Sequence, residues 1–377
     1  MADRAKVSAP FRLSSKTVIA FVWVSILSIA SSAIPQGPAW LECNADGKAG
    51  ALGINVNNLS FGALESDNVM TALRNTGVAW IRINMYWAWT EREKGQFDWK
   101  DSDEAIARLQ AAHINALITI SGPVPCWALS SSGSGPCTKP QWTPPPGGEW
   151  SAYVAEVVKR YSRWVHYWEI WNEPDLIYDT GIADPKQRLV RYRDDILIPA
   201  AATVHRVDPN AKVVAPAFAA VPSGQTGPGP ELEQALITTL SGSAASDVDI
   251  ISLHSYFPES AENKAASARS ALHRAGLGNK PIWITEDGIG TDTPSQLKDP
   301  KFNAGNQASF LSQEISGALE SRAVQKIFWF ALTDSMGHSN DYGLVGNRDY
   351  STFSWTPRPA YTQLQKLAAG QCGGLHK

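Results

Sequence analysis

Two stretches of this sequence share a pattern, in which a short apolar run is followed closely by a glutamate. The first reads YWEIWNEP (Tyr167–Pro174) and the second reads PIWITEDG (Pro281–Gly288). Each begins with a short apolar run typical of a buried strand, and each closes with residues that favour a turn. The sequence therefore predicts two buried strands, with Glu173 and Glu286 at their carboxyl ends.

The same pattern of apolar runs alternating with amphipathic segments extends over most of the chain. The expected strands cover residues 51–56, 78–83, 115–120, 166–171, 212–216, 248–253, 281–285 and 326–331. The expected helices cover residues 66–75, 101–112, 148–164, 187–206, 231–240, 261–275, 306–319 and 360–369. Strands that are apolar on both faces, alternating with helices, indicate a parallel sheet. Eight such units favour a single (β/α)₈ TIM barrel over an open doubly wound sheet.

The segments that follow the strands are long, whereas those that lead back to the next strand are short. The long ones cover residues 121–147, 217–230, 286–305 and 332–359. In a (β/α)₈ barrel, the loops at the carboxyl ends of the strands build the active site. We therefore expect Glu173 and Glu286 to face each other across one cleft.

Two facing carboxylates are the groups that hydrolysis of a glycosidic bond requires. One must be protonated to donate to the leaving oxygen, and the other ionised to attack the anomeric carbon in a retaining enzyme. The amide of Asn172 is placed to bind a sugar 2-hydroxyl. The predicted function is retaining hydrolysis of the β-linkages of an oligo- or polysaccharide, and it needs no cofactor.

Five elements of the sequence resemble the clan A glycoside hydrolases, and most closely family 39, the β-xylosidases and related β-glycosidases. The segment EIWNEPD (residues 169–175) is similar to the acid/base motif and ITE (residues 284–286) to the nucleophile strand. The other three, in the expected order, are Arg82, the pair His254 and Tyr256, and Trp329.

The resemblance implies a role for each matching residue. Glu173 would be the general acid/base and Glu286 the nucleophile, with Arg82 beside Glu286 and Tyr256 orienting it. His254 would shape the sugar pocket, and Trp329 would form the floor beneath the sugar ring. The tryptophans that follow strands are further candidates for sugar contact, namely Trp87, Trp89, Trp127 and Trp142.

Two features depart from the family 39 pattern. Asp287 follows the predicted nucleophile, where an aromatic residue or glycine is more common, and little sequence follows the eighth expected helix. These departures leave a family 5 relationship, the sugar specificity and endo or exo action open. A transglycosylase with the same glutamate pair and a non-catalytic glycan-binding barrel are the alternative functions.

The N-terminus has the pattern of a secretory signal. Basic residues precede a short apolar run at residues 17–30, and Ser31–Ala33 are small. We predict a signal peptide at residues 1–33, or an uncleaved membrane anchor, followed by a catalytic domain at residues 34–377. The expected location is secreted or periplasmic.

Export makes disulfides possible for the 4 cysteines of the chain. Cys126 and Cys137 lie in one loop and are predicted to pair, whereas a Cys43–Cys372 pair is left open.

Charge and metal-binding patterns exclude other classes. The net charge is −3, with no basic block, so nucleic acid is not an expected partner. No cysteine or histidine cluster indicates a metal site, and a carbohydrate is the expected partner. A membrane would be a partner only if residues 1–33 stay attached.

Overall fold

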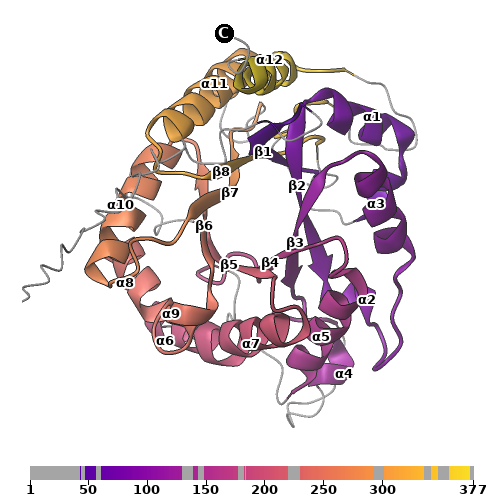
Figure 1. Cartoon of the computed structure of the whole chain (residues 1–377), viewed down its shortest axis with the longest axis vertical. Coiled ribbons are helices and arrows are strands. Elements are labelled where there is room, and N and C mark those ends of the chain that lie inside the picture. Colours follow the sequence, from indigo (N-terminus) through magenta and orange to yellow (C-terminus); the bar gives the residue numbers. More distant parts are fainter. Residues whose placement is uncertain are drawn as a thin grey trace, which may run out of the picture. The chain divides into compact units, whose positions relative to one another are not determined.

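The computed structural model describes residues 43, 47–56, 61–129, 139–142, 148–176, 182, 184–219, 230–291, 301–334, 341–346 and 356–373. Eight parallel strands close into a barrel in the order in which they occur in the chain, and helices surround them (Figure 1). The strands are β1 (Ala49–Asn55), β2 (Val78–Tyr86), β3 (Asn115–Ser121), β4 (Tyr167–Ile170), β5 (Lys212–Phe218), β6 (Ile250–Tyr256), β7 (Ile282–Gly288) and β8 (Lys326–Phe330). The predicted (β/α)₈ TIM barrel is confirmed.

Most helices lie where the apolar periodicity predicted them. The longer ones are α1 (Asp67–Asn75), α3 (Lys100–Ala111), α5 (Glu149–Tyr161), α8 (Pro230–Thr239), α10 (Ala261–Arg274), α11 (Ala304–Glu320) and α12 (Pro359–Gly373). Four short segments were not predicted, because so few residues carry no periodic signal. They are η2 (Phe61–Glu65), α2 (Trp87–Thr90), α4 (Cys126–Leu129) and α9 (Ala244–Asp247).

The helix predicted over residues 187–206 is interrupted. The structure divides this stretch into α6 (Pro185–Arg191), a π-helical turn η4 (Tyr192–Leu197) and α7 (Ile198–Val207). Pro199 lies at the start of α7 and has no backbone N–H to donate to the preceding turn. The apolar periodicity continues through all three segments, so it could not reveal the break.

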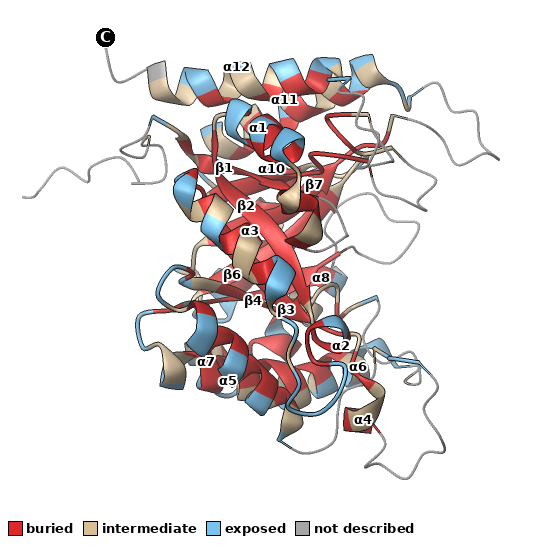
Figure 2. Cartoon of the chain, turned by 90° about the vertical axis from the view of Figure 1, so that its right-hand side faces the viewer, coloured by how far each residue is buried: buried red, intermediate tan, exposed pale blue. Residues whose placement is uncertain are grey.

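The strands separate two apolar layers. Inside the barrel, the rings of Trp80, Trp283 and Phe328 pack on one another. Outside it, the other faces of the strands pack on the helices in a larger core. The strands are therefore buried over most of their length, with Asn115 and Lys212 exposed at the starts of β3 and β5, while the helices expose their outer faces to solvent (Figure 2).

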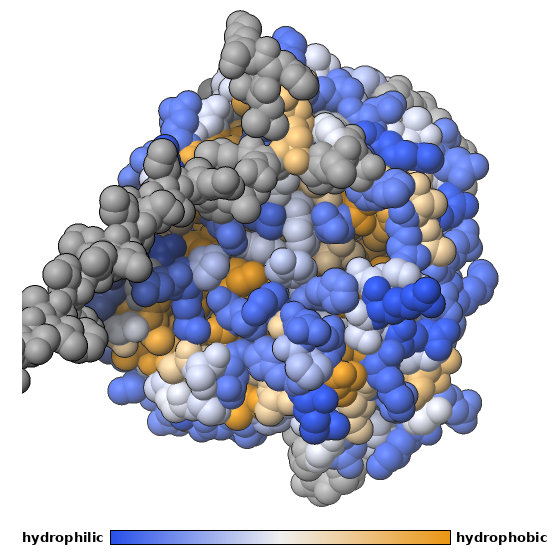
Figure 3. All heavy atoms as spheres, viewed as in Figure 1, coloured by the Kyte–Doolittle hydropathy of each residue, from blue (hydrophilic) through white to orange (hydrophobic). Residues whose placement is uncertain are grey.

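The surface seen down the barrel is mixed. Hydrophilic side chains cover most of it, and apolar ones appear in small areas between them (Figure 3). Among the described residues, no helix is both long enough and apolar enough to span a membrane.

The two ends of the barrel sequence are joined. Cys43 and Cys372 form a disulfide with their Cα atoms 5.4 Å apart, which is the pairing left open by the sequence. Contacts group Pro38–Lys377 into one unit. The predicted signal peptide at residues 1–33 lies outside the described residues, as does Cys137, so the Cys126–Cys137 bridge stays a prediction.

Candidate active site

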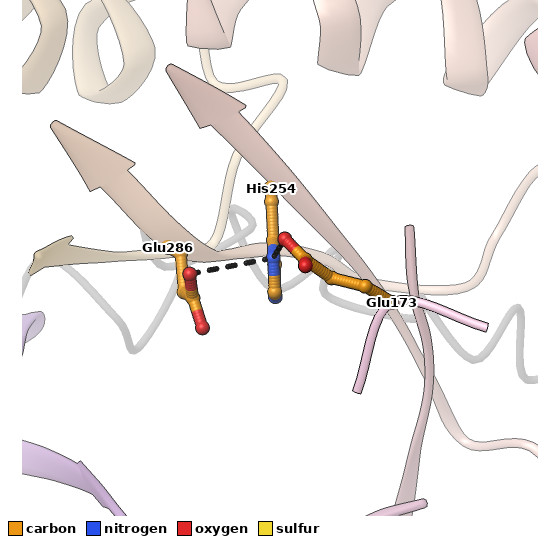
Figure 4. Close-up of side chains that lie close together, drawn as sticks. All are labelled: Glu173, His254 and Glu286. Carbon is orange, nitrogen blue, oxygen red and sulfur yellow. Dashed lines mark hydrogen bonds and ion pairs between the residues drawn. The ribbon is translucent and has the colours of Figure 1, made fainter. Parts of the chain in front are cut away.

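Glu173 lies in a sharp turn directly after β4. Trp171 and Glu173 both have positive φ angles, 71° and 47°, in a region that costs energy for residues other than glycine. The backbone N–H of Glu173 donates to the carbonyl oxygen of Ala217 at 3.1 Å, which ties this turn to β5. The turn directs the carboxylate of Glu173 toward His254 on β6 (Figure 4).

Glu286 faces the same space because β7 contains a bulge. Simple alternation from Trp283, whose ring lies inside the barrel, would turn Glu286 outward. β7 has one extra residue relative to both neighbouring strands between Ile284 and Asp287, and this restores an inward direction for Glu286. The side-chain amide of Asn55 on β1 donates to the carbonyl oxygen of Thr285 at 3.0 Å and so stabilises the bulge.

His254 lies between the two glutamates. Its Nδ1 is 3.0 Å from Oε1 of Glu173 and 3.5 Å from Oε2 of Glu286 (Figure 4). Burial lowers the pKa of His254 to about 4, so the imidazole is neutral near pH 7. His254 therefore spaces and aligns the carboxylates without adding charge.

The two glutamates have different surroundings. Arg82 donates to Oε1 of Glu286 at 2.5 Å, and the hydroxyl of Tyr256 donates to Oε2. Both oxygens of Glu286 therefore accept a hydrogen bond, one of them from a cation. Burial raises the pKa of Glu173, and the positive charges of Arg82 and Lys264 oppose this only in part.

Arg82 is the centre of a buried polar network. Its Nε donates to Glu169 at 2.6 Å, and its two terminal nitrogens donate to Asn55, Glu286 and Asn172. Burial favours the neutral form of Glu169, but the charge of Arg82 and the hydrogen bonds from Thr119 and Arg82 act together to lower the pKa of Glu169. The guanidinium thus holds two carboxylates in fixed positions.

The geometry also meets the minimum for a metal site. One ligand atom each from Glu173, His254 and Glu286 lies within 4.8 Å of the other two. The charge of Arg82 next to Glu286 opposes the entry of a cation, and Tyr256 already bonds the other oxygen. The cluster therefore has the chemistry of a carboxylate pair in which Arg82 already balances the charge of Glu286.

A family model described as the glycosyl hydrolase catalytic core matches residues 141–353, which is more than half of the 377-residue chain. The chain belongs to this family. No curated protein sequence matches it significantly.

Solved structures with a similar fold are also glycosidases. A family 39 glycoside hydrolase from Bacteroides cellulosilyticus WH2 has a TM-score of 0.63 and 18% identity, covering 87% of this chain and 65% of that one. A β-xylosidase from Caulobacter crescentus CB15 has a TM-score of 0.59 and 16% identity, covering 84% and 67%. A β-glucosidase from Thermotoga maritima in complex with azafagomine has a TM-score of 0.56 and 15% identity, covering 80% and 85%.

The TM-scores show that the chain shares the fold of these structures. With the family model, they confirm the predicted resemblance to clan A glycoside hydrolases and to family 39. The chain spans about two thirds of the length of the first two structures.

Most of the polar residues predicted from the sequence meet in one hydrogen-bonded network. Glu173, Glu286, Arg82, His254 and Tyr256 lie in one network, with Arg82 and Tyr256 both on Glu286. Asn172 joins them by accepting a hydrogen bond from Arg82 at 2.7 Å, which leaves its amide N–H group to serve as a donor.

Trp329 does not lie with this group. Phe328 is part of the inner cluster, so the next residue on β8 faces the helices, and Trp329 packs against Phe310 of α11 with ring centres 6.3 Å apart. Trp329 is fully buried there, which corrects its prediction as a sugar-contacting floor. Phe330 packs instead against Tyr256, with ring centres 5.9 Å apart, and occupies the inward position at the end of β8.

Trp87 and Trp127 pack together in the α2–α4 region. Trp87 is fully buried in α2 and donates to Glu91 at 2.8 Å. Trp127 packs edge-on against it at 5.7 Å and donates to the backbone oxygen of Glu91 at 3.0 Å. The N–H groups of both indoles donate to Glu91, and these bonds hold α2 and α4 together.

Three residues of the network were missed. Glu169, Thr119 and Asn55 lie on β4, β3 and β1, and each is linked to Arg82 directly or through Glu169. The available signal was a polar residue inside an otherwise apolar strand, since a buried charge needs a partner. No sequence pattern indicated which partner.

Proposed function

We propose that this glycosyl hydrolase cleaves β-glycosidic bonds of an oligo- or polysaccharide with retention of configuration. The spacing of the two glutamates carries the proposal, since an oxygen of Glu173 lies within 4.8 Å of an oxygen of Glu286. Retaining enzymes hold their carboxyl groups about 5–5.5 Å apart, whereas inverting enzymes separate them by about 6.5–9.5 Å to admit water.

In the first step, Glu286 attacks the anomeric carbon and the bond to the leaving oxygen breaks. The proton of Glu173 goes to that oxygen, so the departing sugar leaves as an alcohol. The raised pKa of Glu173 suits it to hold this proton. Arg82 and Tyr256 fix the two oxygens of Glu286, which keeps the attacking carboxylate oriented.

In the second step, water attacks the same carbon and displaces Glu286. Glu173, now ionised, removes a proton from this water, and both glutamates return to their starting states. Neutral His254 assists both steps, because its Nδ1 lies within hydrogen-bond distance of Glu173 and does not compete for the proton near pH 7. The two carboxylates supply acid, base and nucleophile, so the reaction needs no cofactor.

Export is part of the proposal. The pattern of residues 1–33 favours a secreted or periplasmic enzyme, and the Cys43–Cys372 disulfide supports this, because such bonds persist in oxidising compartments. Expression of the full chain with its own N-terminus, followed by N-terminal sequencing, tests this. A mature protein that begins near Ile34 is expected, whereas the intact N-terminus on a membrane-bound protein would indicate an anchor.

Trapping of the intermediate tests the mechanism. The enzyme is incubated with 2-fluoro β-glycosides that carry good leaving groups, and its mass is measured. One adduct per molecule, mapped to Glu286, is expected, and Glu286→Gln should give none. Inversion of configuration in the product, followed by NMR, would refute retention, and a folded protein that binds oligosaccharides without turnover would indicate a glycan-binding barrel.

A further inference from the structure

A row of aromatic rings leads away from the glutamates. Trp171, two residues before Glu173, lies 5.9 Å from Trp142 between ring centres. Trp142 lies 6.3 Å from Tyr86 at the end of β2, and Tyr86 lies 4.4 Å from Trp89. Trp89 ends the row, and 45% of its surface is exposed. The row therefore presents an indole face to solvent at this end.

Tyr86 connects this row to the candidate active site. Burial raises the pKa of Tyr86 to about 12, and the nearby negative charges of Glu286 and Glu173 contribute to that rise. Tyr86 lies four residues after Arg82 on β2, so the alternation of the strand directs both side chains to the same face, and the Tyr86 ring contacts that of Trp89. A ligand held by the glutamates would meet Tyr86 before it reached Trp89.

A cavity of about 190 Å³ lies beside Tyr86 and Trp89. Its polar walls include Asn84, Arg92, Asp98 and Asp101. Asn84 is only 7% exposed, yet its Oδ1 has no hydrogen-bond partner among the described residues. A buried acceptor without a partner is costly, and a hydroxyl of a bound molecule would satisfy it.

We propose that this cavity is a subsite for a further pyranose ring of a β-linked oligosaccharide. This rests on the proposed function and narrows its substrate to a chain of several sugars. The C–H face of a pyranose with equatorial substituents is flat and apolar, so it packs on the indole of Trp89. Its hydroxyls bind Asn84 and the charged side chains of the cavity wall.

The test compares long and short substrates. The ratio of kcat/KM for xylohexaose or cellohexaose to that for the matching 4-nitrophenyl β-monoglycoside is measured for the wild-type enzyme and Trp89→Ala. Losing the apolar contact should lower this ratio about tenfold. Trp89→Phe should retain most of it, because a flat ring remains. An unchanged ratio in Trp89→Ala would overturn the subsite.

Trp164 provides a matched control. Its side chain is 47% exposed, like that of Trp89, but it follows α5 and precedes β4, at the amino-terminal end of the strands. Trp164→Ala should therefore leave the ratio at the wild-type value. If both variants lower it equally, exposed tryptophans act non-specifically and the proposal fails.

A binding measurement separates this proposal from the proposed reaction. Isothermal titration calorimetry of the two hexasaccharides is performed on the wild-type protein and on Trp89→Ala, each also carrying Glu286→Gln. Binding that is about tenfold weaker in the Trp89→Ala protein supports the subsite, even if the wild-type enzyme proves inactive. Equal affinity, or no binding to either protein, would overturn the subsite without bearing on turnover of small glycosides.

Discussion

Nη1 of Arg82 and Oε1 of Glu286 lie 2.5 Å apart, although 204 positions separate the two residues in the sequence. The Arg82 side chain is fully buried, and a second carboxylate, Glu169, accepts from its Nε. These two ion pairs of Arg82 thus join β2, β4 and β7 in the interior of the barrel.

Replacing Arg82 by methionine should destabilise the fold. Removing one partner of a buried ion pair costs about 3–5 kcal/mol, because the remaining charge is left uncompensated. The free energy of unfolding in urea measures this loss. Lys159→Met is the control, since Lys159 is 71% exposed and makes only a surface ion pair, and its stability should stay near the wild-type value. Equal stabilities of the two variants would show that the Arg82 network is unimportant.

Replacing Glu173 by alanine should affect substrates according to their leaving groups. A poor leaving group needs the proton of Glu173, so kcat/KM for a disaccharide should fall by about 10²–10⁴-fold. An activated 2,4-dinitrophenyl glycoside leaves without protonation, and its first step should be far less affected. Steady-state kinetics on both substrates decides this. An equal loss on both would mean that Glu173 is not the acid.

Asp287 should make the fold less stable at high pH. Burial and the neighbouring Glu314 raise the pKa of Asp287 well above its ordinary value of 3.8, and Lys264 opposes this only in part. Because the folded pKa is raised, the folded state binds a proton more tightly than the unfolded state. Stability is therefore greatest below pH 3.8 for this group, and it falls as pH rises toward the folded pKa.

The isosteric variant Asp287→Asn should remove this contribution. Its free energy of unfolding should change less with pH, by at most about 1.36 kcal/mol per pH unit for one proton. Urea unfolding at several pH values measures the slope. Glu93→Gln is the control, because Glu93 is exposed, and it should retain the wild-type slope. A wild-type slope in Asp287→Asn would contradict the prediction.

The Cys43–Cys372 disulfide closes a loop with a sequence separation of 329 residues. Loss of so long a cross-link should lower the free energy of unfolding by about 2–5 kcal/mol. Cys43→Ser/Cys372→Ser measures this in urea without reductant. Dithiothreitol should destabilise the wild-type protein more than the double variant. If the wild-type protein and the double variant unfold at the same urea concentration, the bond does not constrain the chain.

The sequence predicted the strands of this barrel well, because each is a short apolar run between turn residues. It predicted their ends less well on the side of the active site. β6 and β7 reach Tyr256 and Gly288, beyond the predicted ends at residues 253 and 285. Polar residues there belong to the strands because the network stabilises them, and this support does not appear as local apolar character.

The predictions for Trp329 and Trp87 failed for a related reason. Strands buried on both faces are apolar on both, so nothing in FWF (residues 328–330) shows which rings face inward. The inward position of Phe330 follows from the packing of Phe328 with Trp283, which are 45 positions apart in the sequence. Trp87 was misassigned because a tryptophan after a strand looks the same whether it is buried or exposed.

The sequence by itself determined the fold class and the position of the two glutamates at strand ends, because strand–helix alternation and turn-terminated strands are local patterns. Only the tertiary structure decided how the carboxylates meet. The bulge in β7 turns Glu286 inward, the turn after β4 directs Glu173 to His254, and Asn55 and Arg82 hold them from other strands. These contacts join residues far apart in the sequence, and they form only when the barrel closes.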